Sequence, residues 1–159
     1  MASRKLSDLV PELEVKAKRI LIICGEKEIP ILITCTARLV REQVALYAQG
    51  REPLNHVNYL RGLVGMTPLT IQENKRKVTW TLNSNHLVDL DDGNPANDKS
   101  RAFDFCILKG QQPIWDLKID VNDNDIPDYR EVGEIAEAMG LKWGGRWKKR
   151  PDYPHIELS

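Results

Sequence analysis

The chain has 159 residues, which is enough for one domain with a sizeable hydrophobic core. Lys+Arg and Asp+Glu both count 23, so the net charge is near zero, which argues against a nucleic-acid binder held by a broad basic face. No apolar run reaches the roughly 18 residues needed to span a membrane. We expect a single domain over residues 1–159, acting as a monomer without nucleic-acid or membrane partners. The three cysteines, Cys24, Cys35 and Cys106, lie in apolar settings and indicate buried free thiols.

The first half of the chain predicts two helices with a strand between them. Pro11 suits a first helical turn and Gly25 a helix end, and apolar residues recur between them at helical spacing: Leu13, Ala17, Ile20, Leu21 and Cys24. Residues 31–36 are β-rich and predict a buried strand. A second helix is expected from near Leu39 to Gly50, with Gln43 near one edge of a core face formed by Val40, Val44 and Tyr47. Residues 52–77 remain open between helix and loop.

The second half predicts further strands and one more helix. Residues 78–81 and 101–108 read as strands, separated by a loop at 89–99 that is rich in Asp, Asn, Gly and Pro. Pro127 begins a last helix that Gly140 ends, with an apolar face of Val132, Ile135, Ala136 and Met139. Residues 155–158 can form a closing strand. Helices and strands mix without a strict βαβ rhythm, so we expect an α+β fold with a small, mostly antiparallel sheet flanked by helices.

The C-terminal stretch places Asp152 three residues before His155, across the bend of Pro154. A neutral imidazole is a good zinc ligand, and a carboxylate that does not bind the metal can act as base to a water that zinc activates. By itself the pair is weak evidence, and a surface aspartate beside a half-buried histidine is the more common case.

Two upstream residues strengthen the interpretation as a metal site. His86 follows the strand predicted at 78–81, and Asp104 lies inside the next strand. A His, an Asp and a His from separate places can form a three-ligand zinc site with an open fourth position. Taken singly, His86 could be a satisfied loop or core histidine, and Asp104 could pair with an arginine such as Arg38.

The motifs around these residues resemble those of the VanY-type D-alanyl-D-alanine carboxypeptidase and L-alanyl-D-glutamate peptidase family of zinc peptidoglycan peptidases, and most of all its phage endolysin members. The matching motifs are Ser84-Asn-His86, Ala102-Phe-Asp104, Trp143-Gly-Gly-Arg-Trp147 and Asp152-Tyr-Pro-His155. Upstream, residues 6–13 resemble the opening helix of the family, and Thr36-Ala-Arg38, Glu42-Gln43 and residues 46–51 resemble its Arg, Gln and Tyr-Ala-Gln-Gly-Arg block.

The resemblance implies a hedgehog/DD-peptidase-like fold and a zinc hydrolase that cuts a peptide bond in the peptidoglycan stem. His86, Asp104 and His155 would hold zinc, with Asp152 as the catalytic base. Arg38 would stabilise negative charge on the scissile carbonyl, or else form a structural salt bridge. Weaker candidates for substrate contacts or for support of the metal ligands are Gln43, Ser84 and Tyr47.

Two departures from the family pattern stand out. The loop at 89–99 separates His86 and Asp104 more widely than in many relatives, which leaves Asp89, Asp91 and Asp92 as rival ligands. Residues 52–77 are longer than expected and could form a substrate wall.

The biological role expected from the resemblance is that of a phage endolysin. The N-terminus has no hydrophobic signal core, so we expect a protein that is made in the host cytoplasm and acts on the wall, in the periplasm, after release. One alternative is a bacterial D-Ala-D-Ala carboxypeptidase for wall remodelling. The other is a non-catalytic, zinc-containing wall-binding module, against which the intact Asp152 counts.

Residues 120–131 predict a second, calcium-binding site. Oxygen-bearing residues fall at positions 1, 3, 5, 9 and 12 of an EF-hand-like loop, with a backbone carbonyl at position 7: Asp120, Asn122, Asn124, Asp128 and Glu131, and Ile126. Position 6 is Asp125 where the sharp turn favours glycine, and no entering helix is evident. The alternative is a polar turn in which Asp125 or Asp128 caps the following helix.

Overall fold

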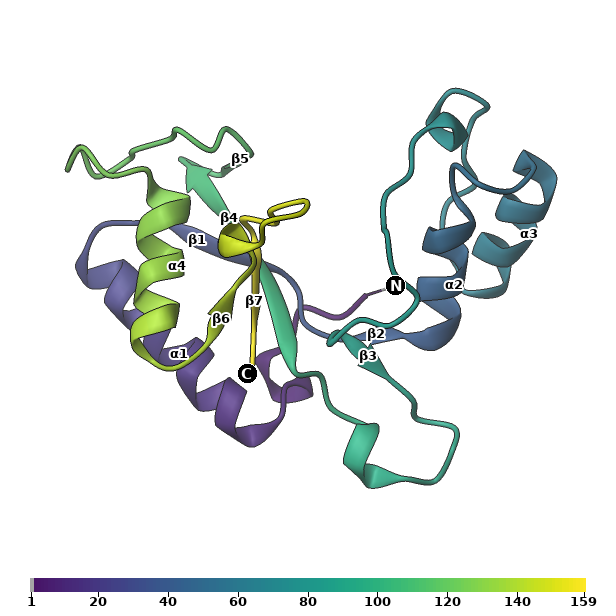
Figure 1. Ribbon diagram of the computed structural model, residues 1–159, viewed down its shortest axis with the longest axis horizontal. Helices are drawn as coiled ribbons and strands as arrows, with labels where there is room; N and C mark the ends of the chain where they lie inside the picture. Colours follow the sequence, from purple (N-terminus) through teal and green to yellow (C-terminus); the bar gives the residue numbers. More distant parts are fainter. Residues whose placement is uncertain (1) are drawn as a thin grey trace.

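The computed structural model describes residues 2–159 and confirms the expected α+β fold (Figure 1). The α-helices are α1 (Pro11–Glu26), α2 (Val40–Ala48), α3 (Leu54–Leu63) and α4 (Asp128–Ala138). The strands are β1 (Ile31–Cys35), β2 (Arg38–Leu39), β3 (Leu87–Val88), β4 (Ala102–Lys109), β5 (Gln112–Ile114), β6 (Lys142–Trp143) and β7 (His155–Glu157). Short 3-10 turns occur at Leu6–Asp8, Glu73–Lys75, Pro95–Asn97 and Gly144–Arg146.

The main sheet is antiparallel, with strand order β1-β4-β7-β6, and β5 forms a hairpin with β4. Because side chains alternate along a strand, Phe103 and Phe105 face the core while Asp104 faces the opposite side of β4. The same alternation in β7 sends Ile156 into the core, opposite Phe103, and leaves His155 beside Asp104. The sheet therefore has an apolar face for the core and a second face that carries polar side chains.

Helices α1 and α4 supply most of the remaining core, as their sequence periodicity predicts. Leu13, Ala17, Ile20 and Cys24 of α1 are buried, as are Val132 and Ala136 of α4. Tyr129 is fully buried at the start of α4, and its hydroxyl donates to the Ile114 carbonyl and accepts from the Ile107 amide. These bonds attach α4 to the sheet.

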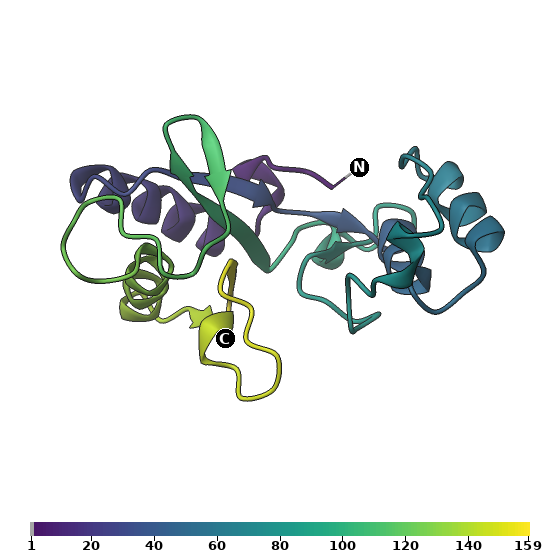
Figure 2. The same cartoon turned by 90° about the horizontal axis from the view of Figure 1, so that it is seen from above.

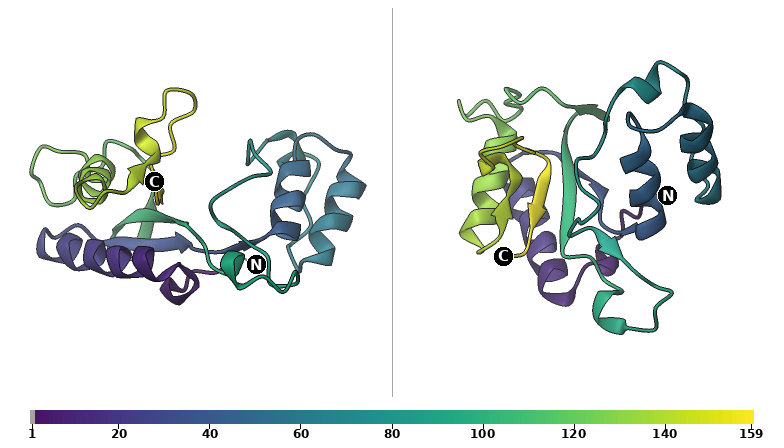
Figure 3. Two further views of the ribbon diagram at one scale, coloured as in Figure 1. Left: turned by 60° about the horizontal axis from the view of Figure 1, so that its bottom comes forward. Right: turned by 45° about the vertical axis from the view of Figure 1, so that its right-hand side comes forward.

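A second group of elements lies on the other side of the molecule, linked to the first through β1 and β2 (Figures 1 and 3). It contains α2, α3 and the short parallel pair β2–β3. Seen from above, in Figure 2, the two groups lie at opposite ends of an elongated molecule. The ambiguous segment at 52–77 thus contains a helix, α3.

Two sequence predictions for this second group are wrong. Residues 78–81 form no strand; the Thr79 and Thr81 carbonyls instead accept from the side chains of Arg51 and Gln43, so side chains replace the missing strand partner. The expected core face of α2 is also misplaced, because Val40 and Val44 are 43% and 39% exposed. The helix buries Glu42, Gln43, Ala45 and Ala48 instead. Hydrogen bonds of buried polar side chains therefore stabilise the second group in addition to a small apolar core.

All three cysteines are buried and free, as expected. Among residues 2–159, no helix combines the length and apolar character needed to cross a bilayer.

Candidate active site

Strand register brings three candidate residues together. Asp104 of β4 is the direct cross-strand partner of His155 on one side and of Cys35 on the other. Such partners have Cβ atoms only about 4.5–5.5 Å apart. His86 enters from the second group, immediately before β3, where its carbonyl accepts from the Arg38 amide at 2.9 Å. The parallel pairing of β2 with β3 thus delivers His86 to the polar face of the main sheet.

Three side-chain atoms converge at this point. His86 Nε2 lies 3.1 Å from Asp104 Oδ1 and 3.2 Å from His155 Nδ1, and His155 Nδ1 lies 3.0 Å from Asp104 Oδ1. The other nitrogen of each ring faces an acceptor: His86 Nδ1 is 3.0 Å from the Thr36 carbonyl, and His155 Nε2 is 2.8 Å from Glu157 Oε2. Because a carbonyl or carboxylate oxygen can only accept, these outer nitrogens carry the protons. In the neutral form of each ring, the inner nitrogen then offers a lone pair.

This donor set fits zinc. Ligand bonds of about 2.0–2.2 Å in a tetrahedral site place the ligand atoms about 3.3–3.6 Å apart, slightly more than the separations found here. Histidines whose outer N–H donates to a carboxylate or backbone carbonyl are typical of metal sites, because that bond fixes the ring orientation. Cys35 Sγ also lies within 4.8 Å of ligand atoms of His86 and Asp104. However, it approaches the outer Nδ1 of His86, at 3.7 Å, so we assign it to the surroundings of the ligands.

The charges in the cluster reinforce one another in the metal-free chain. Burial disfavours charged His86, but hydrogen bonds with Asp104 and Cys35 outweigh it and raise the His86 pKa to about 10. Burial also lowers the pKa of His155, but its hydrogen bonds with Asp104 and Glu157 outweigh that effect and raise the pKa to about 9. Burial likewise opposes the charge on Asp104, yet the two histidines hold its pKa well below the usual range. Metal binding would therefore release protons from the imidazoles.

The Trp143-Gly-Gly motif positions the segment that carries Asp152 and His155. Trp143 is 3% exposed and donates from its indole nitrogen to the Tyr153 carbonyl at 2.8 Å. A Cβ on Gly145 would lie 2.2 Å from the Trp143 ring, and one on Gly144 would lie 2.4 Å from the Asp152 carbonyl oxygen. Because only glycine fits at both places, the motif locks the turn before β7 against the end of the sheet.

Asp152 lines the same pocket as the two histidines and Asp104. No direct hydrogen bond between its carboxylate and the ligand cluster is found among the described residues. Desolvation in the pocket, together with the nearby charge of Asp104, raises the pKa of Asp152. A carboxylate with a raised pKa beside a metal site is suited to accept and return a proton.

The pocket has a volume of about 490 Å³ and lies between the two groups of elements. The sheet side contributes Asp104, His155 and the loop from Trp147 to Asp152, yellow in Figure 1, while the other side contributes His86, Arg38, Ser84 and residues 78–81. At the rim, the Arg150 guanidinium lies 3.9 Å from the centre of the Trp80 ring. One cation–π contact therefore joins the two sides.

Arg38, Gln43, Ser84 and Tyr47 take different places relative to this pocket. Arg38 lines it, and its Nη1 donates to Gln43 Oε1 at 2.8 Å. Gln43 is 1% exposed and lies behind Arg38, outside the pocket lining. Ser84 lines the pocket and accepts the His86 amide through its hydroxyl. Tyr47 also lies outside the lining, with its ring under the Arg51 guanidinium.

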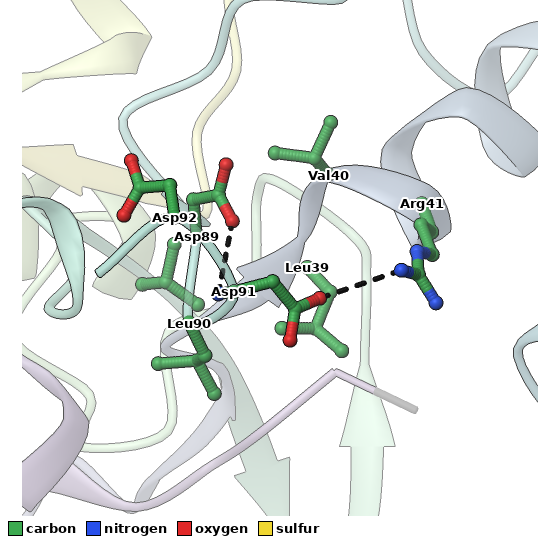
Figure 4. A pocket seen from close by; sticks show the side chains of 8 residues that line it. Leu39, Val40, Arg41, Asp89, Leu90, Asp91 and Asp92 are labelled. Atoms are coloured by element: carbon green, nitrogen blue, oxygen red, sulfur yellow. Dashed lines mark hydrogen bonds and ion pairs between the residues drawn. The ribbon is translucent and has the colours of Figure 1, made fainter. Parts of the chain in front are cut away.

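The rival ligands Asp89, Asp91 and Asp92 line a different pocket, shared with Leu39, Val40 and Arg41 (Figure 4). Asp91 points toward Arg41, with an ion-pair distance of 3.5 Å, and Asp89 accepts the Asp91 amide. The structure thus groups Asp104, not these residues, with the histidines. The possible calcium ligands at 120–131 also lie outside the pocket lining.

Sequence reasoning missed several residues of the site. Glu157 could have been found, since it follows His155 by two positions and therefore shares its face of β7. The Thr36 carbonyl and Cys35 carry no such pattern, because a backbone oxygen and a cysteine in an apolar run look structural. Trp80 and Arg150 meet only through the fold.

The chain is similar to known peptidoglycan peptidases. A family model described as D-alanyl-D-alanine carboxypeptidase matches residues 98–158, which include Asp104, Asp152 and His155. The peptidoglycan L-alanyl-D-glutamate endopeptidase CwlK of Bacillus subtilis is 32% identical over 154 residues, covering 96% of this chain and 74% of the relative. The crystal structure of the L-Ala D-Glu endopeptidase ChiX of Serratia marcescens has the same fold, with a TM-score of 0.53 and 18% identity over 100% of this chain and 89% of that one.

Proposed function

The chain belongs to the D-alanyl-D-alanine carboxypeptidase family of peptidases, as its motifs indicate, and on that basis we propose that it is a zinc-dependent endopeptidase for the L-alanyl-D-glutamate bond in peptidoglycan stem peptides. Family membership makes it a hydrolytic enzyme. The observation that carries the proposal is the convergence of His86 Nε2, Asp104 Oδ1 and His155 Nδ1, each 3.0–3.2 Å from the others. The choice of bond is supported by the 32% identical relative, which is an L-alanyl-D-glutamate endopeptidase.

His86, Asp104 and His155 would hold the metal, with Thr36 and Glu157 fixing the two rings. Zinc, when bound, supplies a Lewis acid that acidifies the attacking water and polarises the scissile carbonyl. Asp152 would take the proton from the attacking water and pass it to the leaving amine. Both groups of elements line the pocket, which supports treating residues 1–159 as one catalytic unit.

Arg38 is placed to stabilise negative charge on the scissile carbonyl. One of its terminal nitrogens donates to Gln43 at 2.8 Å and the other lies 3.8 Å from Cys35 Sγ, so the guanidinium is held at the pocket wall. Gln43 positions this guanidinium from behind, and Ser84 holds the backbone of His86. Tyr47 does not reach the pocket and supports it indirectly, by packing its ring against the Arg51 guanidinium.

The test is digestion of purified sacculi followed by mass analysis of the fragments. We expect peptides with a new amino-terminal D-glutamate and muropeptides that end in L-alanine, lost with a chelator and restored by zinc. Release of free D-alanine alone would instead support a carboxypeptidase, the activity that describes the matching family model. No product from the zinc-loaded protein would overturn both assignments.

We further propose a lytic role, as a phage endolysin acting on the host wall. The support is the resemblance of the motifs at 84–86, 102–104 and 143–155 to the phage members of the family. Permeabilised Gram-negative cells should lose turbidity rapidly when the zinc-loaded protein is added. Slow trimming of stem peptides without loss of turbidity would favour wall remodelling.

A further inference from the structure

The loop before α4 is folded around one carboxylate. Asp120 accepts the backbone amides of Asn124 at 3.2 Å and Asp125 at 2.9 Å. Asp125 has a φ of 66°, the left-handed conformation that glycine supplies at the sixth position of an EF-hand loop. Aspartate tolerates this region better than most residues. The backbone at Asp125 thus makes the sharp turn for which an EF-hand loop normally uses glycine. The missing glycine at position 6 is therefore no obstacle to calcium binding.

A fully buried carboxylate in this loop has an oxygen without a partner. Asp128 is 0% exposed, and its Oδ2 accepts the Val121 amide at 2.7 Å. Its Oδ1 has no hydrogen-bond partner among residues 2–159, and neither has the buried Oδ1 of Asn122. A buried acceptor without a partner is costly, most of all on an ionised group. These two oxygens fall at positions 9 and 3 of the loop.

Negative charge accumulates around Asp128. The carboxylates of Asp120 and Glu131 lie near enough to repel its charge. Glu131, at position 12, is 6% exposed. Its Oε1 pairs with Lys27 Nζ at 2.8 Å, and its Oε2 accepts the Asn124 side-chain amide at 2.7 Å. The Lys27 ammonium therefore pairs with Glu131 within a group of three carboxylates, Asp120, Asp128 and Glu131.

We propose that residues 120–131 form a calcium-binding site separate from the catalytic pocket. The ligands are the side-chain oxygens of Asp120, Asn122, Asn124, Asp128 and Glu131 and the carbonyl of Ile126. An all-oxygen set on a loop suits Ca²⁺ better than Mg²⁺, which demands near-ideal octahedral geometry. Binding exchanges the Lys27 ammonium for the ion at Glu131 and turns the Asn124 amide so that its oxygen faces inward.

The consequence of binding would reach the active site through α4. Asp128 and Glu131 form the first turn of this helix, and a Cβ on Gly133, one turn later, would lie 2.1 Å from the Trp143 ring. The Trp143 indole in turn holds the Tyr153 carbonyl, between Asp152 and His155. Calcium bound at the loop would steady this chain of contacts and stabilise the folded protein by mass action.

The test is calcium titration of the zinc-loaded chain, residues 1–159, in calcium-free buffer, by calorimetry and thermal melting, with Mg²⁺ as the comparison ion. We expect a Kd of about 10⁻⁴ M or tighter and, at millimolar Ca²⁺, a Tm higher by roughly 2–5 °C. Asp120→Asn should weaken binding at least about tenfold. The matched control is Asp123→Asn, which removes the same charge at loop position 4, where no ligand is assigned, and should bind as the parent does.

Three results would overturn the site. The first is an unchanged Tm and no heat of binding in the parent protein, and the second is an equal response to Mg²⁺. The third is equal weakening of calcium binding by Asp120→Asn and Asp123→Asn, which would indicate diffuse attraction of the ion to an acidic loop. Zinc content is measured throughout, and neither readout depends on peptidase activity, so a failure here leaves the proposed catalytic function untouched.

Discussion

The two sides of the active-site pocket are built in different ways. On the sheet side, Asp104 and His155 are cross-strand partners backed by a core that includes Phe103 and Ile156. On the other side, Arg38 and residues 78–81 are held mainly by hydrogen bonds from Gln43 and Arg51. Strand pairing over a packed core holds side chains in fixed positions. Side-chain hydrogen bonds alone hold a segment less rigidly. We therefore expect chemistry to depend most on the sheet side and substrate placement on the other side.

The largest effect should follow from His155→Ala on the sheet side. Removing one of three ligands should strip the metal and reduce hydrolysis to background, measured as zinc per chain and release of stem peptides. His56→Ala is the matched control, because His56 is exposed on α3 and should leave both unchanged. A His155→Ala protein that retained stoichiometric zinc would remove His155 from the site.

The next largest effect should come from Asp152→Asn, which tests the base on the same side. Zinc should stay bound while turnover falls by about a hundredfold or more, since the proton acceptor is lost. Asp89→Asn, in the neighbouring pocket of Figure 4, should keep both zinc and turnover. Near-normal turnover of Asp152→Asn would sink the assignment, and zinc loss in Asp89→Asn would revive the rival ligand.

A smaller effect is expected from Gln43→Leu, across the pocket. This change frees Arg38 and removes the shorter of two hydrogen bonds to the Thr81 carbonyl, so turnover should fall about tenfold, as expected when a charge-stabilising donor loses its orientation. Gln49→Leu also removes a buried amide from the same side, where Gln49 donates to the Glu73 carbonyl, and should lower stability without this kinetic loss. Equal kinetic losses in the two variants would mean that Gln43 only supports the fold.

The smallest effect should follow from Trp80→Ala at the rim. Losing the stack with Arg150 should raise KM a few-fold and leave kcat and zinc content unchanged, because a cation–π contact of this kind contributes little outside the reacting centre. Trp115→Ala, also exposed but outside the pocket lining, is the control. A fall in kcat for Trp80→Ala would show that the rim contact helps to align the two sides.

The division between the two sides also explains what the sequence could predict. Helical spacing identifies α1 and α4, and β-rich runs identify β1 and β4, because these elements bury apolar faces in one core. The spacing of Val40 and Val44 is misleading because α2 buries Glu42 and Gln43 instead. Residues 78–81 have β-forming side chains but no strand to pair with, and composition carries no information about a partner.

Within the site, the motifs pointed to His86, Asp104 and His155, and the structure brings these three together. What short motifs cannot reveal is the second layer of contacts. The Thr36 carbonyl meets His86 only after β2 and β3 pair, and Arg150 meets Trp80 only after two distant loops approach. Such contacts depend on the folded backbone more than on residue type at one position.

The position of Trp143 has a consequence for how this sequence can vary. Its indole fills the space that a Cβ would need at both Gly133 and Gly145, which lie on opposite sides of β6 in the chain. A larger residue at either glycine can be accommodated only if the aromatic ring shrinks as well. A larger residue at either glycine should therefore occur only together with a smaller one at position 143, and a search for tolerated variants that alters one position at a time would miss such combinations.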